Sequence, residues 1–145
     1  MIEEIRRRTI TPHHHFELDI QLESSTILVQ NLTLCQVRLK NDCRFPWIVL
    51  IPRRSNLVEI FDLTLEDQNL LWSEIARISE HMKHRFKAHK MNIEILGNRV
   101  RQLHIHIIAR YESDDAWPNS VLNYGEPEPY LENKMIQRIQ DLSLN

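Results

Sequence analysis

The chain has 145 residues, of which 26% are charged and 42% are hydrophobic, and its formal net charge is −2. These values fit one globular domain with a buried core, and they exclude a nucleic-acid binder that relies on a general positive charge. No apolar run approaches the ~18 residues of a membrane span, and the stretch from Met1 to Arg8 contains no apolar signal segment. We therefore predict a single cytoplasmic domain over residues 1–145, with no membrane or nucleic-acid partner.

Cysteine and glycine are both too scarce for several common kinds of site. Cys35 and Cys43 are the two cysteines and lack CxxC spacing, so neither a disulfide framework nor a structural zinc site is expected. Gly97 and Gly125 are the two glycines, which excludes the glycine-rich loops that bind nucleotide phosphates. His13–His15 is typical of a metal-binding tract or a tag fragment, but no second ligand cluster accompanies it. We expect no metal and no cofactor.

The first half of the chain predicts three strands. Residues 1–25 have no regular pattern, and we interpret the charges of Arg6–Arg8 as a solvated run. Thr26–Val29 is prone to β-structure, Cys35–Lys40 alternates apolar and polar residues, and Trp47–Ile51 is apolar throughout, as in a central strand covered on both faces. Because the connections are short, we expect an antiparallel meander.

A long amphipathic helix follows the third strand. Thr64 is a suitable N-cap, Asp67 supplies an acidic group in the first turn, and apolar residues then recur every three or four positions over about six turns. Met91–Ile95 alternates again, a turn follows at Gly97, and residues 131–144 predict a short helix. The recurring apolar residues are Leu71, Ile75, Ile78, Met82 and Phe86. The expected class is therefore α+β, with about five antiparallel strands, one long helix and a short C-terminal helix.

The stretch Gln102–Arg110 alternates polar and apolar residues, which is typical of a half-buried strand. Its apolar residues should face the core, while Gln102, His104 and His106 share the opposite face. The two imidazoles then lie roughly 6–7 Å apart along the strand, close enough to act on one small group. Either they supply two ligands of a metal centre, or they carry nucleophilic catalysis at phosphorus, in which His104 attacks and His106 donates to a non-bridging oxygen.

Residues 102–108, Gln-Leu-His-Ile-His-Ile-Ile, resemble the motif His-φ-His-φ-His-φ-φ of the histidine triad (HIT) superfamily, where φ is apolar. The order of strands, long helix and hairpin is similar to that family over about residues 16–118, which leaves 119–145 as a C-terminal loop and helix. Two further segments resemble motifs of a bacterial subgroup of diadenosine-tetraphosphate-hydrolase-like proteins: Phe-Pro-Trp at 45–47 and Ala-Trp-Pro at 116–118.

The resemblance implies a nucleotide phosphohydrolase or nucleotidyl transferase that cleaves at the α-phosphate of a dinucleoside polyphosphate or a phosphoramidate. His104 matches the middle histidine of the family, which forms a covalent nucleotidyl-histidine, and His106 matches the histidine that contacts the phosphate. Asn41 matches the residue that usually binds ribose. Asn98, with Asn92 as a weaker match, corresponds to a polar residue that touches the phosphate or the leaving group. The family also implies a homodimer.

Two positions depart from the family pattern. Gln102 replaces the first histidine of the triad and cannot carry charge, and Trp47 stands where relatives commonly have a histidine near the site. Two alternatives therefore stay open: a catalytically weak or inactive nucleotide-binding module, and a metal-binding protein that uses His104 and His106. The arginines that could border an anion-binding cleft are Arg53, Arg54, Arg99, Arg101 and Arg110.

Overall fold

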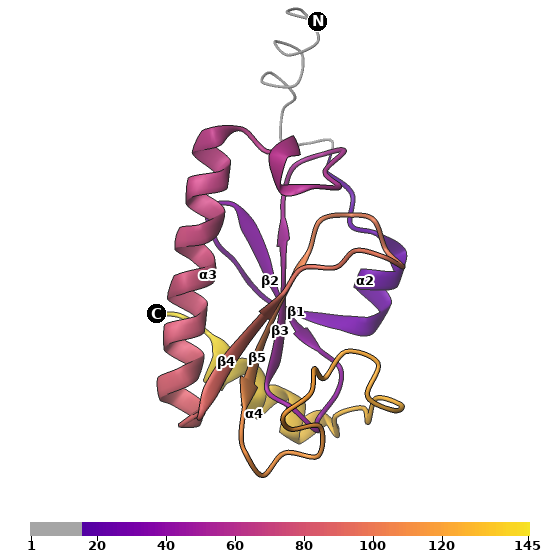
Figure 1. Ribbon diagram of the computed structural model, residues 1–145, viewed down its shortest axis with the longest axis vertical. Coiled ribbons are helices and arrows are strands. Elements are labelled where there is room, and N and C mark those ends of the chain that lie inside the picture. The colour runs from indigo at the N-terminus through magenta and orange to yellow at the C-terminus, as the bar shows by residue number, and fades with distance from the viewer. Residues whose placement is uncertain (1–15) are drawn as a thin grey trace, which may run out of the picture.

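The structure is a computed structural model that describes residues 16–145, so the predictions for Arg6–Arg8 and His13–His15 lie outside the described residues. One five-stranded antiparallel sheet has the order β1-β2-β3-β5-β4 (Figure 1). Its strands are β1 (Thr26–Asn31), β2 (Cys35–Lys40), β3 (Trp47–Pro52), β4 (Lys90–Glu94) and β5 (Ile105–Arg110). The helical segments in the described part are α2 (Ile20–Ser25), a 3-10 turn (Ile60–Asp62), α3 (Leu65–Phe86) and α4 (Glu132–Leu142). The predicted α+β class is confirmed.

The strand that carries the histidines is shorter than its alternation predicted, because its neighbours pair with only part of it. The ladder with β3 begins at Ile105, and the ladder with β4 begins at His106. The prediction that this strand starts at Gln102 is therefore wrong, and His104 lies just before β5. The assignment of faces holds, since Leu103 and Ile105 are both buried in the main core.

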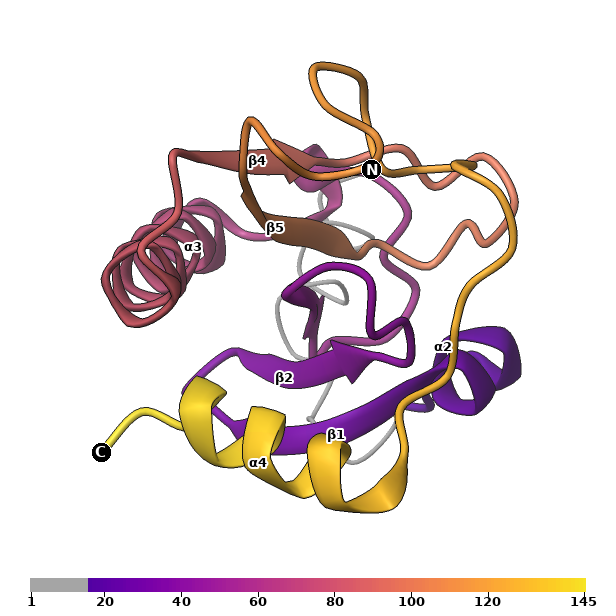
Figure 2. The ribbon, with the colours of Figure 1, turned by 90° about the horizontal axis from the view of Figure 1, so that it is seen from below.

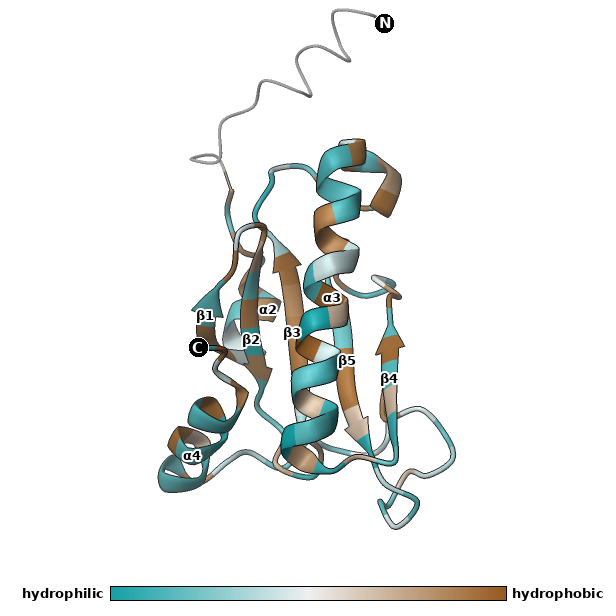
Figure 3. Ribbon diagram, turned by 90° about the vertical axis from the view of Figure 1, so that its left-hand side faces the viewer, coloured by the Kyte–Doolittle hydropathy of each residue, from teal (hydrophilic) through white to brown (hydrophobic). Residues whose placement is uncertain are grey.

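The long helix α3 covers one face of the sheet (Figure 3). Its N-cap is Thr64, as predicted, whose hydroxyl oxygen accepts a hydrogen bond from the backbone N–H of Asp67 at 3.1 Å. The helix ends where Lys87 takes a left-handed conformation, with φ of 51°. The core on this face includes Leu39, Ile48, Leu50, Leu71, Ile75, Ile78, Met82, Ile105 and Ile107, with Met135, Ile139 and Leu142 of α4 packed against it. No helix within residues 16–145 combines the length and the apolar character needed to cross a membrane.

The opposite face of the sheet is covered by α2 and by the chain that follows β5 (Figures 1 and 2). Asp19 caps α2 by accepting a hydrogen bond from the N–H of Gln21 at 2.8 Å. Sequence reasoning missed this helix, because its 6 residues are too few to show a helical period. The smaller core on this face consists of Leu22, Phe45, Trp47, Val49, Ile51, Ile108, Ala116 and Val121.

Glu74 of α3 is a buried carboxylate that ties the helix to the turn between β1 and β2. Its two oxygens accept the backbone N–H groups of Leu34 at 2.7 Å and of Cys35 at 3.0 Å. Glu74→Ala leaves both buried donors unpaired, so we expect it to lower the free energy of unfolding by about 2–5 kcal/mol in urea denaturation. The control is Glu80→Ala on the exposed face of α3, expected to change it by less than ~0.5 kcal/mol. Equal losses for the two variants would contradict this role.

Candidate active site

His104 and His106 lie side by side on the face of the sheet that α2 covers. Their ring centroids are 5.0 Å apart and their planes meet at 78°. Both residues are largely buried, with exposed fractions of 7% and 9%. The predicted pairing of the two imidazoles on one face is therefore what the chain adopts, and the rings are close enough to act on a single phosphate group.

The hydrogen bond of His104 fixes which of its nitrogens is free. Its Nδ1 lies 2.6 Å from the backbone carbonyl oxygen of Gln102. A carbonyl oxygen only accepts hydrogen bonds, so Nδ1 must carry the proton in the neutral ring. The lone pair then resides on Nε2, which makes Nε2 the nucleophilic nitrogen of His104.

His106 is held in the complementary tautomer. The indole Nε1–H of Trp47 donates to Nδ1 of His106 at 3.0 Å. Because an indole N–H can only donate, Nδ1 of His106 carries the lone pair and Nε2 carries the proton. Trp47 therefore does more than remove a histidine from this position: it fixes His106 as a hydrogen-bond donor through Nε2.

The surroundings of His106 keep its ring neutral. Burial, together with the neighbouring His104 and Lys40, lowers its pKa from the ordinary 6.5 to about 3. Lys40 lies with its Nζ 5.6 Å from the centre of the Trp47 ring. Burial also lowers the pKa of Lys40, against an opposing effect of Asp42. His106 should therefore donate through Nε2 over the whole neutral range of pH.

We expect the ring resonances of His106 to stay constant in an NMR titration from about pH 8 to pH 5, while those of the urea-unfolded chain move near 6.5. The unfolded chain binds this proton below about 6.5 and the folded chain does not, so stability falls as pH falls. For this group alone the loss is about 2 kcal/mol between pH 7 and pH 5. A His106 titration midpoint near 6.5 in the folded protein would contradict the buried, neutral assignment.

A cavity of about 330 Å³ opens in front of the two imidazoles, and we call it the imidazole cavity. Its lining combines polar and cationic groups with apolar side chains, and none of its lining residues is Asp or Glu. A site of this kind suits an anionic ligand that also has an apolar part. The lining residues are Gln21, Leu22, Ser25, Lys40, Leu96, Gly97, Asn98, Arg99, Val100, His104, His106, Leu122 and Asn123.

The structure brings only some of the predicted site residues to this cavity. Asn98 lines it together with both histidines. Gln102 instead binds the chain before α2, donating to the carbonyl of Glu17 and accepting from the N–H of Asp19, each at 2.9 Å. Its catalytic role stays a prediction, and its contact with the histidine pair is made by its backbone carbonyl oxygen, which binds Nδ1 of His104.

The two other predicted asparagines have partners outside the cavity lining. Oδ1 of Asn41, next to Lys40 at the end of β2, accepts from the backbone N–H of Tyr130 at 3.0 Å. Oδ1 of Asn92 accepts from Arg110 at 2.7 Å. The nucleotide contacts of Asn41 and Asn92 stay predictions. Asn98 lines the imidazole cavity, whereas these two asparagines do not.

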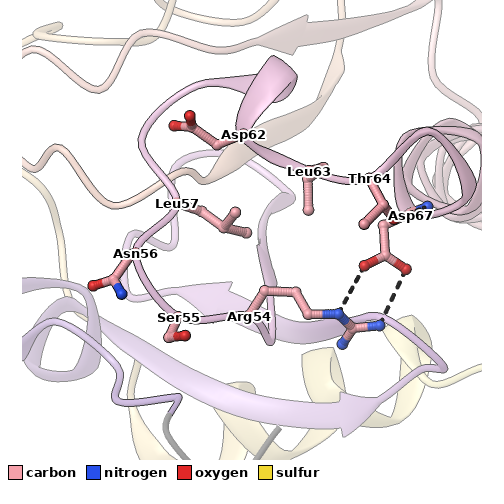
Figure 4. Close-up of a pocket in the computed structure, with 8 residues that line it drawn as sticks. All are labelled: Arg54, Ser55, Asn56, Leu57, Asp62, Leu63, Thr64 and Asp67. Atoms are coloured by element: carbon pink, nitrogen blue, oxygen red, sulfur yellow. Dashed lines mark hydrogen bonds and ion pairs between the residues drawn. The ribbon is translucent and has the colours of Figure 1, made fainter. Parts of the chain in front are cut away.

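Among the candidate arginines, Arg99 lines the imidazole cavity. Arg110 is fully buried and pairs with Asp114 at 2.8 Å. Arg54 forms an ion pair with Asp67 at 2.7 Å in a separate hollow of about 250 Å³ at the start of α3 (Figure 4). That hollow shares no lining residue with the imidazole cavity, so it is separate from the site formed by His104 and His106.

Sequence reasoning missed Lys40 and the contribution of α2. Lys40 is one of the polar residues of the alternating stretch Cys35–Lys40, but nothing in the local pattern tells which polar residues border a site. Gln21 and Ser25 come from a helix that the pattern did not reveal. Within residues 16–145, no group of three or more His, Cys, Asp or Glu side chains is placed to hold a metal ion.

The fold and the site together define a class of protein. Its members combine an open antiparallel sheet with two imidazoles that differ in hydrogen-bonding character and that face a cavity lined by cationic residues. A family model described as the HIT domain matches residues 21–113. The chain therefore belongs to the HIT family. A comparison with curated proteins finds no match.

Several solved structures are similar over nearly the whole chain. A histidine triad protein from Sinorhizobium meliloti is 41% identical with a TM-score of 0.87, covering 91% of this chain and 100% of its own. One from Marinobacter aquaeolei is 40% identical with a TM-score of 0.86, covering 88% and 93%. A third, from Bradyrhizobium japonicum, is 39% identical with a TM-score of 0.85, covering 88% and 95%.

Proposed function

We propose that this chain is a HIT-type nucleotide phosphohydrolase or nucleotidyl transferase that acts at the α-phosphate of a dinucleoside polyphosphate or a phosphoramidate. The observation that carries the proposal is the opposite tautomers of the two imidazoles. His104 presents a lone pair on Nε2, and His106 presents an N–H. A nucleophile beside a donor is the arrangement that phosphoryl transfer through a covalent histidine requires.

In the first step, Nε2 of His104 attacks the α-phosphorus and forms a P–N bond. The bond from phosphorus to the leaving group breaks, and the leaving group departs with the electron pair; an amine leaving group also takes up a proton from solvent. The Nε2–H of His106 donates to a non-bridging oxygen, whose negative charge is greatest as bonds are exchanged. The carbonyl oxygen of Gln102, which accepts from Nδ1–H of His104, stabilises the positive charge that this ring acquires.

In the second step, water attacks the same phosphorus and the P–N bond breaks. The electron pair returns to Nε2 of His104, one proton of the water passes to solvent, and a nucleoside monophosphate is released. When an alcohol or an amine takes the place of water, the same step is a nucleotidyl transfer. Both steps leave His104 and His106 in the tautomers from which they began.

The lining of the imidazole cavity supports a nucleotide as the ligand. Lys40 and Arg99 supply positive charge for the phosphate, and Asn98 supplies a polar contact near it. Leu22 and Val100 are among the apolar residues available to a base. We extend the proposal to Asn41 as a ribose contact through its amide nitrogen, and to a homodimer in the cytoplasm.

The test is a product analysis with adenosine 5′-phosphoramidate and diadenosine tetraphosphate, each in water enriched in oxygen-18. We expect AMP from at least one substrate, with one heavy oxygen on its phosphate. Absence of AMP with both substrates, under saturating binding, would contradict hydrolysis and favour the second candidate.

That second candidate is a nucleotide-binding module without turnover. The observation that favours it is the side chain of Gln102, whose oxygen and nitrogen are both engaged by residues 17 and 19. Gln102→His separates the two candidates. A silent wild type that gains turnover with this substitution identifies the module, whereas an active wild type identifies the enzyme.

A further inference from the structure

A second cavity, of about 260 Å³, adjoins the imidazole cavity, and we call it the loop cavity. The two share Lys40, Arg99, His106, Leu122 and Asn123. His104 lines the imidazole cavity but not the loop cavity. His106 therefore lies at the boundary between the two cavities, with the nucleophile on one side of it.

This arrangement gives the loop cavity a place in the reaction. In phosphoryl transfer the attacking and departing groups lie roughly in line on opposite sides of phosphorus. A phosphorus atom held at His106 and attacked from His104 expels its leaving group away from the nucleophile. The loop cavity begins on that side, since it contains His106 but not His104.

The wall of the loop cavity is built and held in position. Arg44 donates to the carbonyl oxygen of Tyr124 at 2.6 Å, and its guanidinium stacks on the rings of Phe45 and Tyr124. Asp42 binds the same guanidinium through both carboxylate oxygens, at 2.9 and 2.7 Å. The segment that closes the cavity is thus fixed to the turn between β2 and β3 without help from a ligand.

The charges that remain favour an anion. The Asp42 carboxylate is already compensated by Arg44, and hydrogen bonds from that arginine hold its pKa below the usual range although burial opposes them. The remaining charged groups that line the cavity are two cations, Lys40 and Arg99, and one carboxylate, that of Glu126. The ring of Trp47 under Lys40 also limits hydration of the ammonium group, which strengthens its attraction for a nearby anion.

We propose that the loop cavity is the subsite for an anionic leaving group, so that the substrate class is a nucleoside joined to an oligophosphate chain rather than to a neutral amine. This inference rests on the function proposed above and selects between the two substrate classes that it contains.

The test compares two substrates with the same adenylyl half. Adenosine 5′-phosphoramidate releases ammonia, and adenosine 5′-tetraphosphate releases inorganic triphosphate when attacked at the α-phosphate. Glu126→Lys removes a carboxylate from the loop cavity and adds a positive charge beside Lys40 and Arg99, so we expect it to raise the ratio of kcat/KM for the tetraphosphate over the phosphoramidate by about 3- to 10-fold. Inorganic triphosphate should also inhibit this variant at lower concentration than it inhibits the wild type.

Glu132→Lys is the matched control, because it makes the same change of net charge at an exposed position of α4 that does not line the cavity. We expect that variant to leave the ratio unchanged. If the wild type turns over the phosphoramidate but Glu126→Lys changes the ratio of kcat/KM no more than Glu132→Lys does, the subsite is contradicted. The proposed enzymatic function is then unaffected. Turnover of neither substrate by the wild type would overturn both proposals.

Discussion

Replacement of His104 by alanine is expected to lower the turnover of nucleotide substrates by at least about 10³-fold, since no other group takes over covalent attack. Binding should survive, because Lys40, Arg99 and Asn98 still line the cavity. The measurement is kcat from product formation, together with the Kd for AMP, which should change by less than about 3-fold.

His84→Ala is the control for this substitution. His84 is an exposed histidine on α3, and its side chain is 78% accessible, so its removal should leave turnover unchanged. Retention of wild-type kcat by His104→Ala would mean that another group is the nucleophile. Loss of turnover together with loss of AMP binding would mean that the variant has lost the site rather than the reaction.

Replacement of Trp47 by phenylalanine is expected to lower kcat by about 10- to 100-fold with less than about a 3-fold change in KM. Phenylalanine fills most of the buried volume but cannot donate to Nδ1 of His106. His106 is then free to place its proton on Nδ1, which removes the donor that faces the phosphate. Because that hydrogen bond is available only to the neutral ring, its loss should also raise the pKa of His106.

Nitrogen-15 NMR of the imidazole nitrogens checks the tautomer directly. In the wild type we expect Nε2 of His106 to be protonated across the neutral range, and in Trp47→Phe we expect a mixture of tautomers. Ile51→Val is the control, since Ile51 is buried in the same small core, makes no hydrogen bond to His106 and lines neither cavity. Equal losses of kcat in the two variants, with His106 unchanged in both, would reduce Trp47 to a packing residue.

Local patterns in the sequence predict β2, β4 and the long helix because those elements are periodic, and β3 because it is apolar throughout. The apolar residues of α3 and the alternation in β2 both lie on the faces that the pattern assigned. The start of β5 differed, because the end of a strand depends on how far its neighbours extend. The short helix α2 carries too few residues to show a period.

The site was predictable only where its residues are neighbours in the sequence. His104 and His106 are two positions apart, and their common face follows from the pleat. The bond between Trp47 and His106 spans 59 positions and depends on the register of β3 against β5. The bond between Asn41 and Tyr130 spans 89 positions. No local pattern encodes contacts of this kind.

The most direct measurement is intact-protein mass spectrometry during turnover of adenosine 5′-phosphoramidate or diadenosine tetraphosphate, with samples quenched at neutral pH and in acid. The account predicts an added adenylyl mass on the neutral-quenched protein that acid removes, that maps to His104, and that His104→Ala lacks. AMP release with no adduct at any time, or an adduct that persists in His104→Ala, would contradict covalent catalysis by His104.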